Sequence, residues 1–124
     1  MSKSLSRHRK MKRERDERLA VYLTRLLTVD PKRFFVEWQK RERSWVEQIH
    51  HRGRSLQKKS KREDSHTRIF AIYDQADSFL SSHPEINQLV GTSTRDLLRT
   101  ECQKAFAKAI DPRLAKLVSR MKLR

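Results

Sequence analysis

The fold of this chain is easiest to read in residues 31–51, whose sequence is PKRFFVEWQKRERSWVEQIHH. Large apolar side chains recur there at the intervals that place them on one face of an α-helix. The members of this stripe are Phe35, Trp38, Trp45 and Ile49, with Phe34 and Val46 at its edge. Asp30 and Pro31 supply an N-cap acceptor and then a residue whose φ is already helical. The segment therefore predicts an amphipathic helix from Pro31 to about His51.

The aromatic side chains of this helix allow three interpretations. Only 35% of the residues are hydrophobic, so we expect both tryptophans to be needed in the core. A second interpretation stacks Trp38 or Trp45 on a nucleobase, and a third lays the helix on a membrane surface. Glu37, Glu42 and Glu47 count against the membrane because they would repel anionic lipid. Glu42 also falls inside the stripe, so it either pairs with a cation from another helix or marks the edge of the buried face.

Helical signals also punctuate the rest of the chain. Further helices are predicted over about 6–28, 65–81, 84–90, 94–110 and 112–121. Gly53 and Gly91 are expected as left-handed C-caps, and Ser82 with Glu85 fits a capping box before the helix that starts at Pro84. The sequence thus predicts an all-α protein, a small bundle of about five or six helices with a basic N-terminal helix or arm.

The domain organisation follows from where apolar residues begin. The stripe of the first helix starts only at Leu19, and a charged helix without a packing face is marginal by itself. We therefore expect residues 1–18 to be a basic N-terminal arm or projecting helix. Residues 19–124 are expected to form the helical domain, with a basic segment near 52–64 that is either a mobile linker or a fraying helix end.

Composition narrows the class of protein. The 124 residues include 30 Lys and Arg against 15 Asp and Glu, a formal net charge of +15. One cysteine cannot close an intrachain disulfide or a Cys-x-x-Cys metal clip, and no run approaches the ~18 apolar residues of a membrane span. We expect a basic intracellular protein, cytoplasmic or, in a eukaryote, nuclear, with a polyanionic partner.

The charge is unevenly distributed along the chain. Residues 1–18, 31–63 and 91–124 carry net charges of +5, +7 and +6, whereas residues 64–90 carry −3. Such segregation indicates a polarised surface, if the fold brings the positive blocks together. The acidic segment 64–90 is then expected to face a protein neighbour or to pack the core.

These blocks predict a non-enzymatic nucleic-acid-binding protein that contacts the phosphate backbone of DNA or RNA, as an accessory subunit of a nucleoprotein complex. Eighteen of the 30 cations are arginine, which suits bidentate phosphate contacts. The candidate binding residues are Arg7, Arg9, Lys10, Lys12, Arg13, Arg15, Arg18, Lys40, Arg41, Arg43, Arg52, Arg54, Lys58, Lys59, Lys61, Arg62, Arg95 and Arg99. The alternative function is an adaptor or inhibitor that docks an acidic protein surface; a peripheral membrane protein is a third hypothesis.

Residues 84–104 are a candidate for a helix-turn-helix that would recognise base sequence. The expected order of short helix, Gly91 and second helix is that of a helix-turn-helix, in which Arg95, Arg99 and Gln103 would face the groove. Asn87 stands where that motif needs a small residue, so the match is weak. The alternative is an ordinary helical hairpin with these residues in solvent.

Signals for catalysis are few. Two glycines cannot build a phosphate-cradling loop. Glu47 and His50 form one Glu-x-x-His pair, whereas helical di-iron sites use two. Cys102 falls on an apolar face and is expected to be a buried thiol. The sequence therefore predicts no enzyme activity, no cofactor and no metal.

Overall fold

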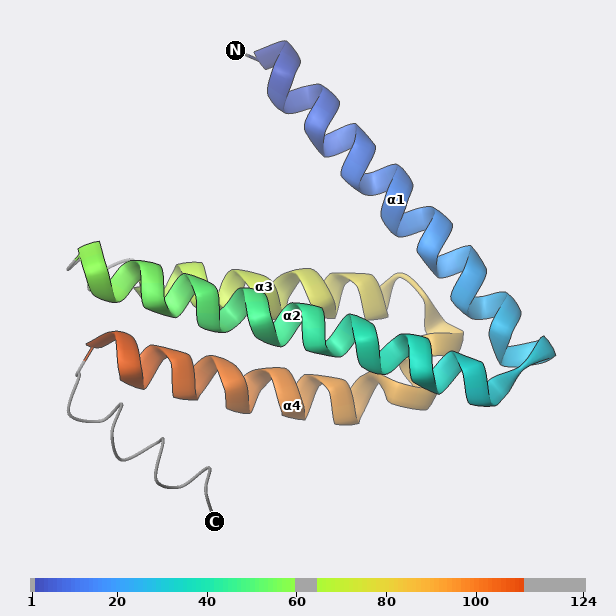
Figure 1. Ribbon diagram of the computed structural model, residues 1–124. Helices are drawn as coiled ribbons and strands as arrows, with labels where there is room; N and C mark the ends of the chain where they lie inside the picture. The colour runs from blue at the N-terminus through green and yellow to red at the C-terminus, as the bar shows by residue number, and fades with distance from the viewer. Residues whose placement is uncertain (1, 60–64, 111–124) are drawn as a thin grey trace.

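The computed structural model describes residues 2–59 and 65–110, and this part of the chain is helical apart from two short corners. It contains four helices: α1 (Ser2–Val29), α2 (Pro31–Lys59), α3 (Ser65–Ser81) and α4 (Pro84–Ile110). Figure 1 shows that α2, α3 and α4 lie lengthwise against one another, with α3 antiparallel to the other two. The all-α prediction is confirmed, but the described residues form four helices where the sequence predicted five in that range.

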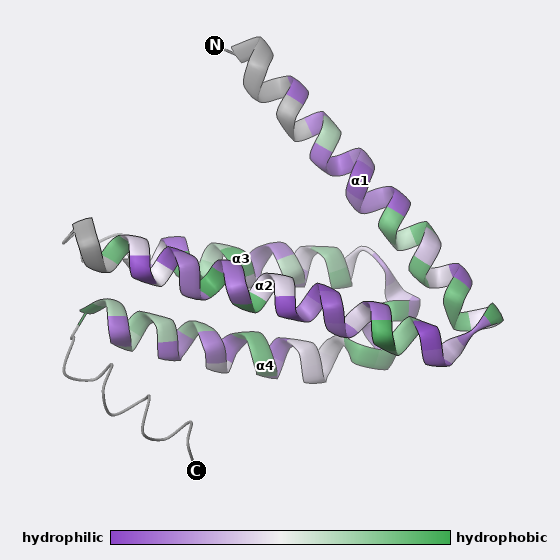
Figure 2. Cartoon of the chain, viewed as in Figure 1, coloured by the Kyte–Doolittle hydropathy of each residue, from purple (hydrophilic) through white to green (hydrophobic). Residues whose placement is uncertain are grey.

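Helix α1 is arranged differently from the other three. It packs mainly on α2 and diverges from the bundle, so its N-terminus lies far from α2, α3 and α4 in Figure 1. Its buried side chains, Ala20, Leu23 and Leu26, all lie in its C-terminal third. Figure 2 shows hydrophilic residues along the middle of α1 and hydrophobic ones near its C-terminal end. The expected start of packing at Leu19 is therefore where α1 meets the bundle.

The core lies between α2, α3 and α4, with the C-terminal end of α1 over one side. Trp38 and Trp45 are each 2% exposed, so the core interpretation of the tryptophans is confirmed. The phase of the stripe was wrong at its first turn, because Phe34 is fully buried and Phe35 is 44% exposed. Phe34 stacks against Trp38 with ring centroids 6.1 Å apart, one helical turn away. The buried series thus continues at intervals of four and seven residues through Ile49 to Leu56, on one face of the helix.

The predicted end of α2 near His51 was wrong, and the first half of segment 52–64 continues the helix, as the alternative of a helix end allows. Helix α2 runs on to Lys59, and residues 60–64 lie outside the described part of the chain. Gly53 is not a C-cap but a buried point of close approach between α2 and α4. A Cβ at Gly53 would lie 3.3 Å from both the Cβ and the carbonyl oxygen of Ala105. The glycine therefore lets two backbones pack where the local sequence alone indicated a helix end.

The predicted turn at Gly91 was also wrong. Helix α4 is continuous from Pro84 to Ile110, so neither a helix-turn-helix nor a helical hairpin exists there. Gly91 is buried in mid-helix, and a Cβ on it would meet Asn87 Oδ1 at 2.2 Å and Arg95 Nη1 at 2.8 Å. Its missing side chain leaves space in which Asn87 and Arg95 contact one another across two turns.

The helix starts were predicted with mixed success. Asp30 caps α2 as expected, because its Oδ1 accepts a hydrogen bond from the Arg33 backbone N–H at 3.3 Å. The capping box at Ser82 was wrong: its hydroxyl donates backwards to the Ser78 carbonyl at 2.9 Å, which also accepts the Ser82 backbone N–H at 3.1 Å. Helix α3 has the predicted bounds. The helix predicted over 112–121 lies outside the described residues.

Candidate nucleic-acid interface

The outer face of α1 carries a row of cations on the side away from Ala20, Leu23 and Leu26. All four members of this row are exposed; we call Arg7, Lys10, Arg18 and Arg25 the α1 basic row. At ~100° per residue they fall within a narrow sector of the helix. Arg13 and Arg15 are exposed on its two flanks. Helix packing therefore leaves these guanidinium and ammonium groups in solvent.

Helix α2 carries a second row opposite its buried stripe. This α2 basic row consists of the exposed residues Arg33, Lys40, Arg43 and Arg54. Their separations of 7, 3 and 11 residues are close to whole numbers of helical turns, and the row is ~32 Å long at 1.5 Å per residue. Glu47 and His51 are exposed on the same face. The same periodicity that buries the aromatic side chains thus aligns four cations on the opposite side.

The α2 basic row reaches α1 at the corner between the two helices. Arg33 hydrogen-bonds with the Tyr22 side chain of α1, and this contact, followed by the charges of Tyr22 and Glu37, raises the pKa of the Arg33 guanidinium. Arg25 and Arg33 were absent from the predicted set. Their helical phase, on the side of each helix away from its buried stripe, was the signal that could have identified them.

Arg41 was predicted to bind nucleic acid but lies underneath α1. Its guanidinium carbon is 4.9 Å from the centre of the Trp45 ring, and its Nη2 is 3.4 Å from Asp16 Oδ1. Its Nε is buried and has no hydrogen-bond partner. Burial lowers the pKa of Arg41, and the nearby Asp16 opposes that shift. These contacts make Arg41 a link between α1 and α2 rather than a free cation.

A groove separates the middle of α1 from the bundle. It has a volume of about 680 Å³ and an apolar floor that includes Trp45 and Phe79. Lys12 crosses it to donate to Gln75 Oε1 of α3 at 3.2 Å. Acidic side chains, among them Glu17 and Asp74, also line it. Cations and acids are mixed here, so the groove lacks the single sign of charge that a phosphate site needs.

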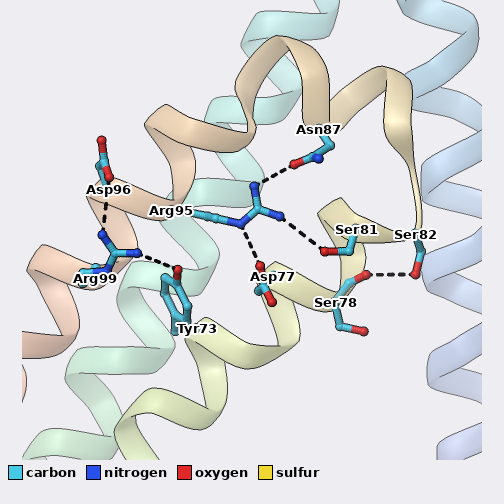
Figure 3. Close-up of polar contacts among 9 residues, drawn as sticks. All are labelled: Tyr73, Asp77, Ser78, Ser81, Ser82, Asn87, Arg95, Asp96 and Arg99. Carbon is cyan, nitrogen blue, oxygen red and sulfur yellow. Dashed lines mark hydrogen bonds and ion pairs between the residues drawn. The ribbon is translucent and has the colours of Figure 1, made fainter.

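Arg95 of α4 was predicted to face a DNA groove, but its guanidinium donates hydrogen bonds to three acceptors within the fold (Figure 3). Its Nε donates to Asp77 Oδ1 at 2.7 Å, its Nη1 to Asn87 Oδ1 at 2.7 Å, and its Nη2 to Ser81 Oγ at 3.4 Å. Asp77 and Ser81 belong to α3. The guanidinium therefore joins α3 to α4, which accounts for one of the acids in segment 64–90.

Arg99 is also engaged with α3, one turn further along α4. It donates to the Tyr73 hydroxyl at 3.1 Å, and its guanidinium carbon lies 5.6 Å from the centre of the Tyr73 ring. Its second partner is Asp96 Oδ1 at 3.7 Å. Figure 3 shows Arg99 and Arg95 side by side on α4, both directed toward α3. The structure thus does not bring them together with the α1 and α2 basic rows.

The remaining predicted residues divide into two groups. Arg54 is exposed on α2, whereas Arg52 is half-buried and donates to the Arg68 carbonyl at 2.9 Å. The side chains or residues that lie outside the described part of the structure are Arg9, Lys58, Lys59, Lys61 and Arg62.

The core contains a hydrogen-bonded chain of three residues that the sequence did not predict. Trp38 Nε1 donates to Thr94 Oγ1 at 2.9 Å, and that hydroxyl donates to Glu42 Oε2 at 2.9 Å. Thr94 is fully buried. Glu42 therefore neither pairs with a cation nor simply marks the edge of the buried face, because its carboxylate accepts a hydrogen bond from the Thr94 hydroxyl. The indole of Trp38 is committed to this contact, which rules out the base-stacking interpretation for it.

Several polar groups were considered for catalysis or metal binding. His50 Nε2 lies 2.7 Å from Glu101 Oε2 across α2 and α4, in mid-helix and not near the helix C-terminus as expected. No group of three or more His, Cys, Asp or Glu side chains converges within the described residues. Cys102 is buried as predicted, and burial raises the pKa of its thiol to about 12. In residues 2–59 and 65–110 no helix is long and apolar enough to span a bilayer.

Comparison with protein-family models, with curated proteins and with solved structures finds no match for this chain.

Proposed function

We propose that this protein binds the phosphate backbone of nucleic acid through the α1 and α2 basic rows, as a non-enzymatic accessory subunit of a nucleoprotein complex. The observation that carries the proposal is the exposure of all eight side chains of the two rows. Each cation that neutralises a phosphate releases condensed counterions, so such contacts supply affinity without sequence readout.

The positions of the other cations support the assignment to these two rows. Arg41, Arg95 and Arg99 have partners on another helix, and binding a phosphate would require them to exchange those partners. In the α2 basic row, Lys40 pairs with Glu37 of its own helix and Arg33 contacts Tyr22, but both cations remain exposed. The α2 basic row contains no residue with a buried guanidinium or ammonium group. Its cations can therefore move onto a phosphate without loss of packing.

The test compares two triple variants with the same loss of charge. In the first, Arg33, Lys40 and Arg43 are replaced by Gln; in the matched control, Arg68, Arg99 and Lys104 are replaced by Gln. Binding to a fluorescent duplex is measured by anisotropy between 50 and 200 mM NaCl. The logarithmic slope for duplex DNA is expected to fall by about 0.9 for each phosphate contact removed in the first variant, and by much less in the control.

Two outcomes would contradict the proposal. One is an absence of affinity for DNA and for RNA at low salt. The other is an equal loss of affinity in both triple variants, which would mean that net charge matters and the basic rows do not. Stoichiometric co-purification with an acidic protein, without nucleic acid, would favour the adaptor function instead.

A further inference from the structure

The cations near the N-terminus of α1 cover more of the helix than one face. Arg13 and Arg15 are two residues apart, so they leave the helix in nearly opposite directions. Arg7, Lys10 and Arg18 lie between them on the outer side, and all five side chains are exposed. Together they occupy ~200° of arc at 100° per residue. A flat anionic surface would engage only part of that arc.

The bundle lies on the remaining side of this segment. Lys12 contacts Gln75 and Asp16 contacts Arg41, which places both residues on the face toward α2 and α3. Most of the arc is thus directed away from the rest of the molecule, whereas Arg13 at its edge also borders the groove toward the bundle. Figure 1 shows α1 diverging from the bundle along this stretch. A ligand that wraps three sides of α1 would meet cations on each side, with the exposed Glu14 and Glu17 between them. At a groove floor a carboxylate can accept from cytosine.

We infer that the N-terminal half of α1 lies in the major groove of duplex DNA, an inference that rests on the proposed function. The major groove of B-DNA is ~12 Å wide and admits an α-helix, whose diameter with side chains is ~10–12 Å. Arg13 and Arg15 reach the phosphates on the two walls. Arg7 and Arg18 face the floor, where arginine can donate to guanine.

Other nucleic acids fit this geometry less well. The major groove of A-form RNA is deep and narrow, and side chains cannot read it. Single strands are held by aromatic stacking as well as charge, whereas residues 2–18 of α1 contain no Phe, Tyr or Trp. Duplex DNA is therefore the class of ligand that uses both flanks of α1.

The experiment measures the affinity of the full chain for four probes of one sequence. These are duplex DNA, duplex RNA, single-stranded DNA, and duplex DNA whose cytosines carry a glucosyl-hydroxymethyl group, which fills the major groove. We expect unmodified duplex DNA to bind about tenfold more tightly than the other three. Netropsin, which occupies the minor groove, is expected not to displace the protein.

A pair of variants tests the two flanks. Replacing Arg13 and Arg15 by Gln is expected to weaken duplex DNA binding about tenfold and to abolish the difference between plain and glucosylated DNA. The matched control replaces Arg68 and Arg99 by Gln and is expected to keep that difference. Thermal melts by circular dichroism confirm that each variant is folded.

The outcomes separate this inference from the proposed function. Equal affinity for plain DNA, glucosylated DNA and duplex RNA would overturn the groove placement and leave phosphate binding intact. Displacement by netropsin would also overturn it. Failure to bind any of the four probes would overturn the proposed function together with the inference.

Discussion

Thr94 shows at the scale of one residue how a polar group is accommodated in this core. Its hydroxyl accepts a hydrogen bond from the Trp38 indole and donates one to the Glu42 carboxylate, so one oxygen of α4 bonds to two residues of α2. A buried donor without a partner costs about 1–3 kcal/mol. The three residues therefore fix how α2 and α4 lie against each other, in addition to the apolar contacts between them.

Replacing Thr94 by Val tests that role because the two side chains have the same shape. The indole N–H and the carboxylate both lose a partner, so we expect the free energy of unfolding to fall by about 1–3 kcal/mol. Urea denaturation followed by tryptophan fluorescence measures the change. Thr92→Val is the control, since Thr92 is exposed on the same helix; similar effects of both substitutions would argue against the hydrogen-bonded chain.

Helix α4 raises a question at the scale of the element, namely why it does not break at Gly91. Arg95 donates to Asp77 of α3 and to Asn87 on the other side of Gly91, and Thr94 bonds to α2. Most helical stability in proteins comes from such packing rather than from propensity. The glycine serves here as space for the side chains of Asn87 and Arg95, whose contact Figure 3 shows.

Gly91→Ala is expected to destabilise the protein, although alanine normally stabilises a helix interior by about 0.5–1 kcal/mol relative to glycine. The new methyl group would displace Asn87 Oδ1 and Arg95 Nη1 and break a charge-assisted hydrogen bond worth about 1.5–3 kcal/mol. We expect a net loss of about 1 kcal/mol in urea unfolding.

The same substitution in an Asn87→Ala background provides the control. The clash with Asn87 is then absent, so Gly91→Ala is expected to be neutral or stabilising there. Equal effects of Gly91→Ala in both backgrounds would show that the cost arises elsewhere, for example from the backbone of α4.

The whole molecule carries a net charge of +15 and exposes much of it on α1 and α2. Mutual repulsion of this kind destabilises the compact state, and salt screens it over a Debye length of ~10 Å at 0.1 M. The surface proposed to bind phosphate is thus also a source of instability in the free protein. A bound polyanion would relieve it.

We therefore expect the melting temperature to rise by several degrees between 20 and 300 mM NaCl. Replacing Arg33, Lys40 and Arg43 by Gln should raise the melting temperature at 20 mM NaCl and reduce its dependence on salt, while nucleic-acid binding weakens. Calorimetry at both salt concentrations measures these changes. A melting temperature that falls as salt is added would mean that ion pairs such as Arg95–Asp77 outweigh the repulsion.

The sequence by itself determined the features that depend on residues close to one another along the chain. Helical periodicity placed Trp38, Trp45 and Ile49 on a buried face, and the Asp30–Pro31 pair marked the start of α2. The same periodicity applied to the cations would have identified the α2 basic row, including Arg33. The all-α class, the bounds of α3 and the buried thiol of Cys102 followed from similar local patterns.

Only the tertiary structure decided which local signals are used. Gly53 and Gly91 read as helix ends, but contacts with Ala105 and between Asn87 and Arg95 keep α2 and α4 continuous. Charge counts could not separate Arg95, which α3 holds, from Arg43, which solvent surrounds. The physical reason is common to both cases: a glycine or a cation has several local uses, and the choice among them depends on residues distant in sequence that the fold places beside it.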